Sequence, residues 1–154
     1  MNSYRIEVLD ELPESMEEKK SQDLAVYESS HGVDVNYNKF SIVLIAKSGE
    51  SFAALTAYTA YAEVYIDDLW VETSYRGKGH GSKLVQFLED RFKHKGFNNI
   101  NLVTSAFQAP GFYIKCGFEA EFTRENRHNP SLSKTFFVKF FDDAVQTQGL
   151  KQVT

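Results

Sequence analysis

The sequence has very little cysteine and no long hydrophobic run. Its 154 residues include a single cysteine, Cys116, which excludes an internal disulfide. No apolar stretch approaches the roughly 18 residues that a membrane-spanning helix requires. The first residues, MNSYRIEVLDELPE, lack the basic and apolar regions of a secretory signal. We therefore expect a protein of the reducing cytoplasm that has no membrane partner.

Metal-binding patterns are also missing. The histidines at positions 31, 80, 94 and 128 show no ligand spacing, and one cysteine cannot supply a zinc site. Cys116 has no neighbouring histidine in the sequence to activate it as a nucleophile. We expect no metal ion, and Cys116 fits a small core residue better than a catalytic one.

Basic charge is scarce overall. The chain has 21 acidic and 17 basic residues, a formal net charge of -4, and eight of the acids lie within the first 30 residues. Proteins that bind nucleic acid through the phosphate backbone usually carry an excess of basic residues. The charge balance therefore argues against nucleic acid as a partner.

The remaining composition is that of a globular domain. Hydrophobic residues make up 42% of the chain and charged residues 25%, a mixture too apolar for a disordered protein. The length suits one domain with one core, and there is no repeat or linker. We expect a single domain over residues 1–146 and a flexible tail over residues 147–154.

The hydrophobic pattern predicts both strands and helices. Val64 and Ile66 would share one face of a strand, which Asp68 would interrupt, while Gly96 and Gly117 would each end a helix. The predicted strands span residues 4–9, 40–46, 52–61, 62–71, 100–104, 118–122 and 135–141, and the predicted helices span 13–30, 82–95 and 110–113. This order favours an α/β fold with a mixed sheet.

A glycine-rich loop follows the strand that ends at Val71. It reads Arg76-Gly77-Lys78-Gly79-His80-Gly81-Ser82-Lys83, and no acid occurs between Thr73 and Leu88. Glycines at alternate positions before a helix let backbone N–H groups surround a pyrophosphate. A P-loop or a Rossmann fingerprint starting at Gly77 would require glycine at Ser82, so both fit poorly. A flexible connection without a ligand is the remaining alternative.

Two segments of the chain resemble one enzyme superfamily. Arg76-x-x-Gly79-x-Gly81 matches the acetyl-CoA motif Gln/Arg-x-x-Gly-x-Gly/Ala of the GCN5-related N-acetyltransferases (GNAT). The later segment from Ala109 to Phe118 resembles the superfamily pattern Ala-x-x-x-Tyr-x-x-x-Gly-Phe. The string FQAPGFY within 107–113 is similar to that of small single-domain bacterial acetyltransferases.

The resemblance covers residues 40–141 and implies a fold and a reaction. The fold would be a mixed, mostly antiparallel central sheet flanked by helices, splayed at the acetyl-CoA site, with a bulge near residues 69–71. The reaction would be direct transfer of acetyl from acetyl-CoA, the co-substrate, to an amine in a ternary complex. The acceptor expected is a primary amine of a small molecule. The alternative acceptor is a protein N-terminus or a lysine. The alternative function is that of a CoA-binding sensor without catalysis. The resemblance also leaves open that the protein forms a homodimer.

The resemblance also implies which residues bind acetyl-CoA. Relatives commonly have an asparagine where this chain has Ala106, so Ser105 or Gln108 would contact the pantetheine arm instead. The other predicted contacts are the strand residues Leu69, Trp70 and Val71 for the pantetheine arm and the oxyanion, and the loop residues Arg76, Gly77, Lys78, Gly79, His80, Gly81 and Ser82 for the pyrophosphate.

Catalysis requires a neutral amine and a proton for the departing thiolate. Tyr113 matches the superfamily tyrosine, and a phenol with a pKa near 10 keeps its proton at neutral pH; the alternative is a packed tyrosine. Asp67 is the first candidate for orienting or deprotonating the amine, Asp68 the second and Glu63 the third. Asn101 stands where some N-terminal acetyltransferases have glutamate, and its amide cannot act as a base.

Overall fold

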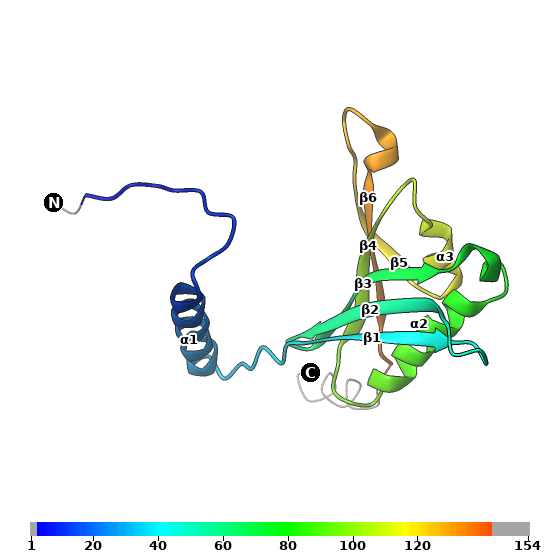
Figure 1. Ribbon diagram of the computed structural model, residues 1–154, viewed down its shortest axis with the longest axis horizontal. Helices are drawn as coiled ribbons and strands as arrows, with labels where there is room; N and C mark the ends of the chain where they lie inside the picture. Colours follow the sequence, from blue (N-terminus) through cyan, green and yellow to red (C-terminus); the bar gives the residue numbers. More distant parts are fainter. Residues whose placement is uncertain (1–2, 143–154) are drawn as a thin grey trace, which may run out of the picture. The chain divides into compact units, whose positions relative to one another are not determined.

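The computed structural model describes residues 3–142. Contacts divide the chain into two units, residues 1–35 and 36–154, and Figure 1 shows the elements of each. The tail predicted over residues 147–154 lies outside the described residues, and the single domain over residues 1–146 stays a prediction. Within residues 3–142, no helix is long and apolar enough to cross a membrane.

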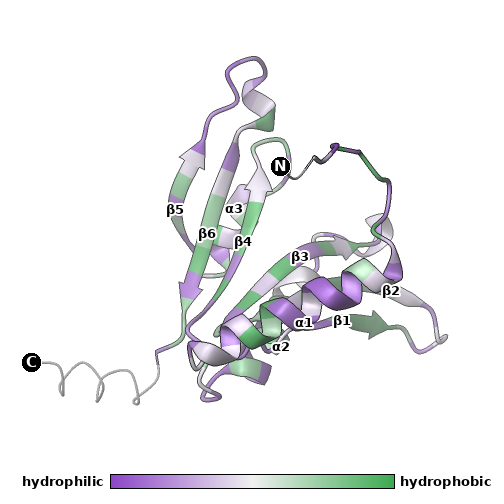
Figure 2. Ribbon diagram, turned by 90° about the vertical axis from the view of Figure 1, so that its left-hand side faces the viewer, coloured by the Kyte–Doolittle hydropathy of each residue, from purple (hydrophilic) through white to green (hydrophobic). Residues whose placement is uncertain are grey.

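In residues 3–35 of the first unit, the helix predicted over residues 13–30 is present as α1 (Glu14–Ser30). Glu14 and Glu17 lie in its first turn, where negative charge is favoured by the helix dipole. None of its residues is buried, and Figure 2 shows hydrophilic and hydrophobic residues mixed along it. Within its own unit, α1 is therefore a solvated helix.

The strand predicted at residues 4–9 is wrong. This segment has no regular secondary structure, and Tyr4, Ile6 and Val8 are 86%, 87% and 97% exposed. A strand exists only when its backbone groups pair with a neighbour. No strand of the described chain pairs with this segment.

Over residues 36–142, the second unit is built on a six-stranded sheet, which is mixed and mostly antiparallel as predicted. The strands follow the order β1-β2-β3-β4-β6-β5, and only β3 and β4 run parallel. Their bounds are β1 (Asn38–Ile45), β2 (Ser51–Ala60), β3 (Glu63–Val71), β4 (Asn99–Ser105), β5 (Glu119–Arg124) and β6 (Lys134–Phe140).

Two α-helices pack on one face of this sheet. They are α2 (His80–Phe92) and α3 (Pro110–Lys115), and the described part of the unit also contains the short 3-10 turns η1 (Thr73–Tyr75) and η2 (Pro130–Leu132). The α2 residues Leu84, Val85 and Leu88 are buried in one core with residues of all the central strands. The predicted end at Gly96 is wrong: α2 ends at Phe92, because the backbone of the next residue, Lys93, is extended (ψ 145°).

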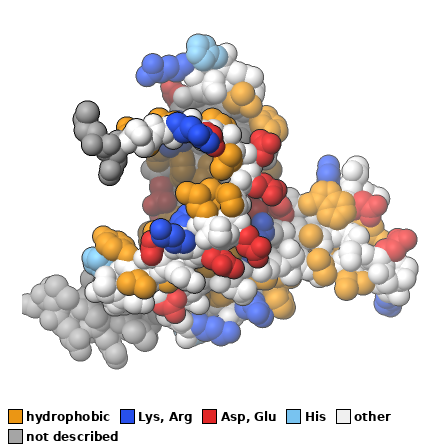
Figure 3. Space-filling model, turned by 60° about the vertical axis from the view of Figure 1, so that its left-hand side comes forward, with side chains coloured by type: hydrophobic (Ala, Val, Ile, Leu, Met, Phe, Trp, Pro, Cys, Tyr) orange, Lys and Arg blue, Asp and Glu red, His pale blue; other side chains and the backbone are white. Residues whose placement is uncertain are grey.

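The core lies on one face of the sheet, and the other face is open. Val64, Ile100 and Phe137 are at most 2% exposed on the core face, and Figure 2 shows hydrophobic segments on β4 and β6. No helix within residues 36–142 covers the opposite face. On the face displayed in Figure 3, basic side chains lie singly or in small groups among acidic and hydrophobic ones.

The sheet opens between its two parallel strands. β3 and β4 pair only at Glu63↔Asn99, Val64↔Ile100 and Tyr65↔Asn101, and they then diverge. The splay predicted from the resemblance is therefore present. It leaves the edge of β3 from Ile66 to Val71 without a partner strand on the β4 side.

The bulge in β3 lies earlier than predicted. Leu69 and Val71 pair in regular register with Leu55 and Ala53, so there is no bulge at residues 69–71. Thr56 pairs with Asp68 and Ala57 with Ile66, which leaves Asp67 as the extra residue. An extra residue shifts the alternation of a strand by one position.

Candidate functional site

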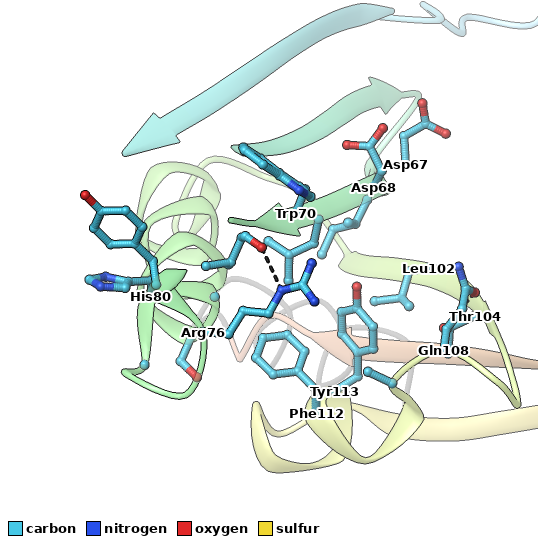
Figure 4. Close-up of a pocket in the computed structure, with 18 of the residues that line it drawn as sticks. Asp67, Asp68, Trp70, Arg76, His80, Leu102, Thr104, Gln108, Phe112 and Tyr113 are labelled. Atoms are coloured by element: carbon cyan, nitrogen blue, oxygen red, sulfur yellow. Dashed lines mark hydrogen bonds between the residues drawn. The ribbon is translucent and has the colours of Figure 1, made fainter. Parts of the chain in front are cut away.

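A cavity of about 600 Å³ opens where β3 and β4 diverge, bounded by the start of α2 and by α3 (Figure 4). Three of the predicted site residues, Glu63, Lys78 and Ser105, lie outside its lining; the others line it, namely Asp67, Asp68, Leu69, Trp70, Val71, Arg76, Gly77, Gly79, His80, Gly81, Ser82, Gln108 and Tyr113. Residues up to 47 positions apart in the sequence, Ile66 and Tyr113, thus meet at one cavity. Lys78 lies outside this lining, with Nζ 5.9 Å from the ring centre of Tyr75.

The glycine loop presents free backbone donors to this cavity. Gly77 and Gly79 have φ of +75° and +82°, a conformation that glycine adopts without strain. Within the described chain, the N–H groups from Gly77 to Ser82 have no backbone acceptor. A cluster of unpaired N–H groups at the start of a helix fits the pyrophosphate of a nucleotide cofactor.

Arg76 is exposed but is tied by a hydrogen bond to the end of β3. Its Nε donates a hydrogen bond of 2.8 Å to the carbonyl oxygen of Val71, drawn as a dashed line in Figure 4. The terminal guanidinium nitrogens remain available to an anion. Arg76 therefore links the end of β3 to the glycine loop and places a positive charge in the cavity.

The bulge turns Asp68 away from the core. Strict alternation predicted that Asp68 would interrupt the face of Val64 and Ile66, and this prediction is wrong. Because Asp67 is the extra residue, Leu69 packs against the core and Asp68 is exposed beside the cavity. Figure 4 shows both carboxylates at the same end of the cavity.

The two acids differ in their surroundings. Asp67 lies 3.6 Å from Lys39 Nζ, and both of these side chains are about half exposed. Asp68 has no ion-pair partner within residues 3–142. Its charge is close enough to the Tyr113 phenol to act on that group's pKa. Asp68 is therefore the acid with the less compensated charge.

Tyr113 reaches the cavity from α3 and is only 9% exposed (Figure 4). Burial, followed by electrostatic interactions with Cys116 and Asp68, raises the pKa of Tyr113 to about 12. Its ring is fixed by Phe118 and Phe137, with centroids 5.8 and 6.2 Å away. The phenol therefore holds its proton throughout the neutral range and is positioned by packing.

Gln108 lines the cavity, whereas Ser105 does not. The side-chain oxygen of Gln108 accepts hydrogen bonds from Thr104 Oγ1 at 3.1 Å and from the Ser105 N–H at 2.8 Å. These bonds orient the side chain and leave its amide N–H donors for a ligand. Of the two predicted replacements for the missing asparagine, the geometry favours Gln108.

Several lining residues were missed by the sequence analysis. Phe112 lies against Gly81, where an added Cβ would stand 3.1 Å from its ring. Tyr75 stacks on Phe52 with centroids 4.1 Å apart, and His80 meets the edge of Phe52 at 4.9 Å. Phe112 precedes Tyr113 in the sequence, and Tyr75 precedes Arg76. This adjacency to a predicted site residue is the sequence signal that could have identified them.

Cys116 lies behind the site and does not line the cavity. The thiol is half-buried, and burial raises its pKa. A protonated thiol is a poor nucleophile. Among residues 3–142, no group of three or more histidine, cysteine or acidic side chains is placed to hold a metal ion.

Comparisons with known proteins agree with this geometry. The model of the acetyltransferase (GNAT) family matches residues 6–118. Blasticidin-S acetyltransferase of Streptomyces morookaense is 35% identical over 71 residues, which are 46% of this chain and 52% of that protein. The chain thus spans about half the length of this curated relative.

Solved structures show the same fold. An acetyltransferase from Bacillus cereus superposes with a TM-score of 0.71 and 29% identity, covering 88% of this chain and 98% of its own. A Bacillus anthracis protein described as a streptothricin acetyltransferase, solved with acetyl coenzyme A, has a TM-score of 0.58 and 21% identity, covering 68% of this chain and 64% of its own. The family match spans well over half of the chain. This chain therefore belongs to the acetyltransferase (GNAT) family.

Proposed function

We propose that this protein transfers the acetyl group of acetyl-CoA to a primary amine of a small molecule by direct attack in a ternary complex. The observation that carries this proposal is the cavity itself. It joins free amides of the glycine loop, a neutral buried phenol and two acids within one space. The names of the blasticidin-S and streptothricin enzymes support a small amine as acceptor.

Acetyl-CoA would lie along the opening between β3 and β4. The amides from Gly77 to Ser82 and the charge of Arg76 would bind its pyrophosphate. The unpaired edge of β3 from Leu69 to Val71 would hydrogen-bond the pantetheine arm, with Gln108 donating from the opposite side. The bound thioester supplies an activated acetyl group.

The residues around the thioester would then assist the transfer. Backbone N–H groups on the open edge of β3 would stabilise the oxyanion. Tyr113 would donate its proton to the departing sulfur, because its phenol is neutral at pH 7 and points into the cavity. Asp67 and Asp68 would attract and orient a cationic amine at the open end.

Binding of acetyl-CoA is the first expected result. At a hundredfold excess over its Kd, the ligand should raise the melting temperature by about 5 to 10 °C. Gly79→Ala should weaken binding about tenfold, because φ there is +82° and the new methyl group would enter the open space of the loop. Calorimetric titration with acetyl-CoA measures both quantities.

Gly49→Ala is the matched control for this result. Gly49 has a similar φ of +94° in the turn after β1, with open space around it, and it does not line the cavity. Both variants should lose a similar amount of stability, and only Gly79→Ala should lose affinity. The absence of any thermal shift with wild-type protein would exclude both an acetyltransferase and a CoA sensor.

Acceptor selection should depend on the acids at the bulge. Asp68→Asn should lower kcat/KM for a polyamine about tenfold, because an uncompensated carboxylate attracts the ammonium group. Asp67→Asn should have a smaller effect, since Lys39 already offsets that charge. Neither substitution should change kcat/KM for a neutral arylamine more than about twofold.

The comparison of the two acceptors decides the role of the acids. An equal loss with polyamine and arylamine would mean that the acids support the strand rather than the acceptor. The rates can be followed as free CoA released in a screen of polyamines, amino acids, aminoglycosides and peptides. If peptides were turned over faster than the other acceptors, the acceptor would be a protein rather than a small amine.

A further inference from the structure

A second, smaller cavity of about 270 Å³ lies beside the first, on the open face of the sheet. Polar residues from β3 and β4 form most of its wall, and β5 and β6 complete it. The lining residues are Glu63, Tyr65, Asn98, Asn99, Asn101, Glu121, Val138 and Phe140. The proposed function does not use this polar cluster.

Hydrogen bonds fix the central carboxylate of this cluster. The Tyr65 hydroxyl donates to one oxygen of Glu63, and Asn99 Nδ2 donates to the other at 2.9 Å. Asn101 Nδ2 donates in turn to Asn99 Oδ1 at 2.7 Å, and Asn99 is only 3% exposed. Glu63 is therefore held as an acceptor of the Tyr65 proton by a chain of oriented amides.

This hydrogen bond also shapes the titration of the phenol. The bond to Glu63 is the main cause that raises the pKa of Tyr65 to about 12, with burial and the charges of Glu63 and Tyr58 adding to it. A hydrogen bond with Asn101 acts in the opposite direction. Tyr65 is therefore a neutral phenol, oriented between an amide and a carboxylate.

Tyr65 lines the second cavity at the end of the paired stretch of β3 and β4. Its pair with Asn101 is the last one before β3 and β4 diverge. On β4, Asn101 lines the second cavity and Val103, two residues further along, lines the first. Residues two apart on a strand point to the same face and lie about 7 Å apart. Ile66, the residue after Tyr65, also lines the first cavity, so Tyr65 borders the apex of the splay along β3.

We propose that Tyr65 and Glu63 together remove the proton from the acceptor ammonium group, with Tyr65 contacting the amine and Glu63 receiving the proton. This inference rests on the proposed function. The ammonium proton passes to the phenol oxygen as the phenol proton passes to the carboxylate. Asn101, which cannot act as a base itself, positions this pair.

The remaining steps account for each bond and each proton in the transfer. The amine lone pair forms the C–N bond, the C–S bond breaks, and the sulfur takes its proton from Tyr113. Tyr113 recovers a proton through water from the nitrogen that has become acylated. Glu63 releases its proton to solvent, which accounts for the single proton set free when an ammonium ion is acetylated.

Few other charges face the pair. Tyr58 of β2 stacks on Tyr65 with ring centroids 5.0 Å apart, and Glu121 of β5 lines the same cavity as Glu63. β4 contributes the neutral amides, and β6 contributes Val138 and Phe140. No basic side chain lines this cavity within the described chain, so Glu63 has no cation there that would compete for its charge.

Rates measured against pH test the pair. Tyr65→Phe and Glu63→Gln should each lower kcat for an alkylamine about 100-fold at pH 7. The loss should shrink to less than about fivefold near pH 9.5, because the fraction of free alkylamine rises as the pH approaches its pKa of about 10.4. With a neutral arylamine the loss should stay below about threefold at both pH values.

Tyr58→Phe is the matched control, since it removes a hydroxyl from the stacked neighbour and leaves the network intact. It should keep kcat within about twofold of wild type. A loss in Tyr65→Phe and Glu63→Gln that is the same at pH 7 and 9.5, or the same for both acceptor types, would overturn the inference. So would unchanged rates in both variants. Failure of the wild-type protein to acetylate any amine would instead refute the proposed function.

Discussion

Replacement of Tyr113 by phenylalanine should lower kcat by about 100-fold or more, because the departing thiolate would lose its proton donor. The phenol is 9% exposed, and burial raises its pKa to about 12. Phenylalanine fills nearly the same volume between Phe118 and Phe137, so the packing should be retained. Steady-state release of CoA from acetyl-CoA and a polyamine gives the rate.

The affinity for acetyl-CoA should separate this chemical role from a structural one. In Tyr113→Phe, the Kd measured by calorimetry should stay within about threefold of wild type. Tyr37→Phe is a suitable control, since Tyr37 is 59% exposed and does not line the cavity. A turnover rate in Tyr113→Phe equal to that of wild type would rule out Tyr113 as the acid.

The pKa of Tyr113 also constrains the pH dependence. A phenol with a folded pKa of about 12 remains protonated well beyond the ordinary value of 10. Any loss of activity between pH 8 and 10 should therefore come from another group. The raised pKa favours the folded state below pH 10, and this contribution should disappear as the pH rises from 10 through 12.

Phe137→Ala should have the largest effect on stability, about 3 to 5 kcal/mol in the free energy of unfolding. Phe137 is 2% exposed at the centre of β6 and is among the largest fully buried side chains. Its ring also packs on Tyr113 at 6.2 Å, so the cavity left behind should loosen the proposed acid. Urea denaturation measures the loss, and kcat should fall together with stability.

Phe140→Ala provides the comparison on the same strand. Phe140 is 52% exposed, so its truncation should cost about 1 kcal/mol or less. If the two variants were equally stable, the core assigned to this face of the sheet would be incorrect. If Phe137→Ala lost stability but retained full kcat at a temperature where it is folded, Tyr113 would be positioned by other contacts.

Much of the fold followed from patterns within single elements. The stripe of Leu84, Val85 and Leu88 predicted α2 correctly, and the alternation of Val64 with Ile66 predicted the buried face of β3. Periodicity is a local property, so it identifies an element wherever that element then packs. The glycine-loop motif is also local in sequence, and the loop that it identified lines the cavity.

The predictions that failed depended on partners far away in the sequence. The position of the bulge at Asp67 is set by the register between β2 and β3, so strict alternation assigned Asp68 to the wrong face. Tyr4, Ile6 and Val8 alternate as a strand does, but strand formation requires a neighbour that the pattern cannot supply. Lengths and ends of elements likewise depend on backbone angles, such as the extended Lys93 after α2.

The aromatic and amide residues around the site illustrate the same limit. Phe112 lies within the FQAPGFY string and Tyr75 beside the glycine-loop motif, but neither pattern assigned them a binding role. They join the cavity because α3 and η1 are brought to the same opening. Glu63, Tyr65 and Asn99 form a network only because β3 and β4 align in one register. Such a network becomes visible only when the pairing of the strands is known.

The short contact between β3 and β4 has a mechanical consequence. Within the described residues 36–142, three residue pairs form the only ladder that joins the group β1–β2–β3 to the group β4–β6–β5. The sheet therefore consists of two groups of strands that are joined by a short ladder, and the shared core supplies the other contacts between the two groups. A ligand that hydrogen-bonds to both groups would add a second connection between them. Its binding should therefore restrict the motion of the two groups relative to each other, and its release should restore that motion.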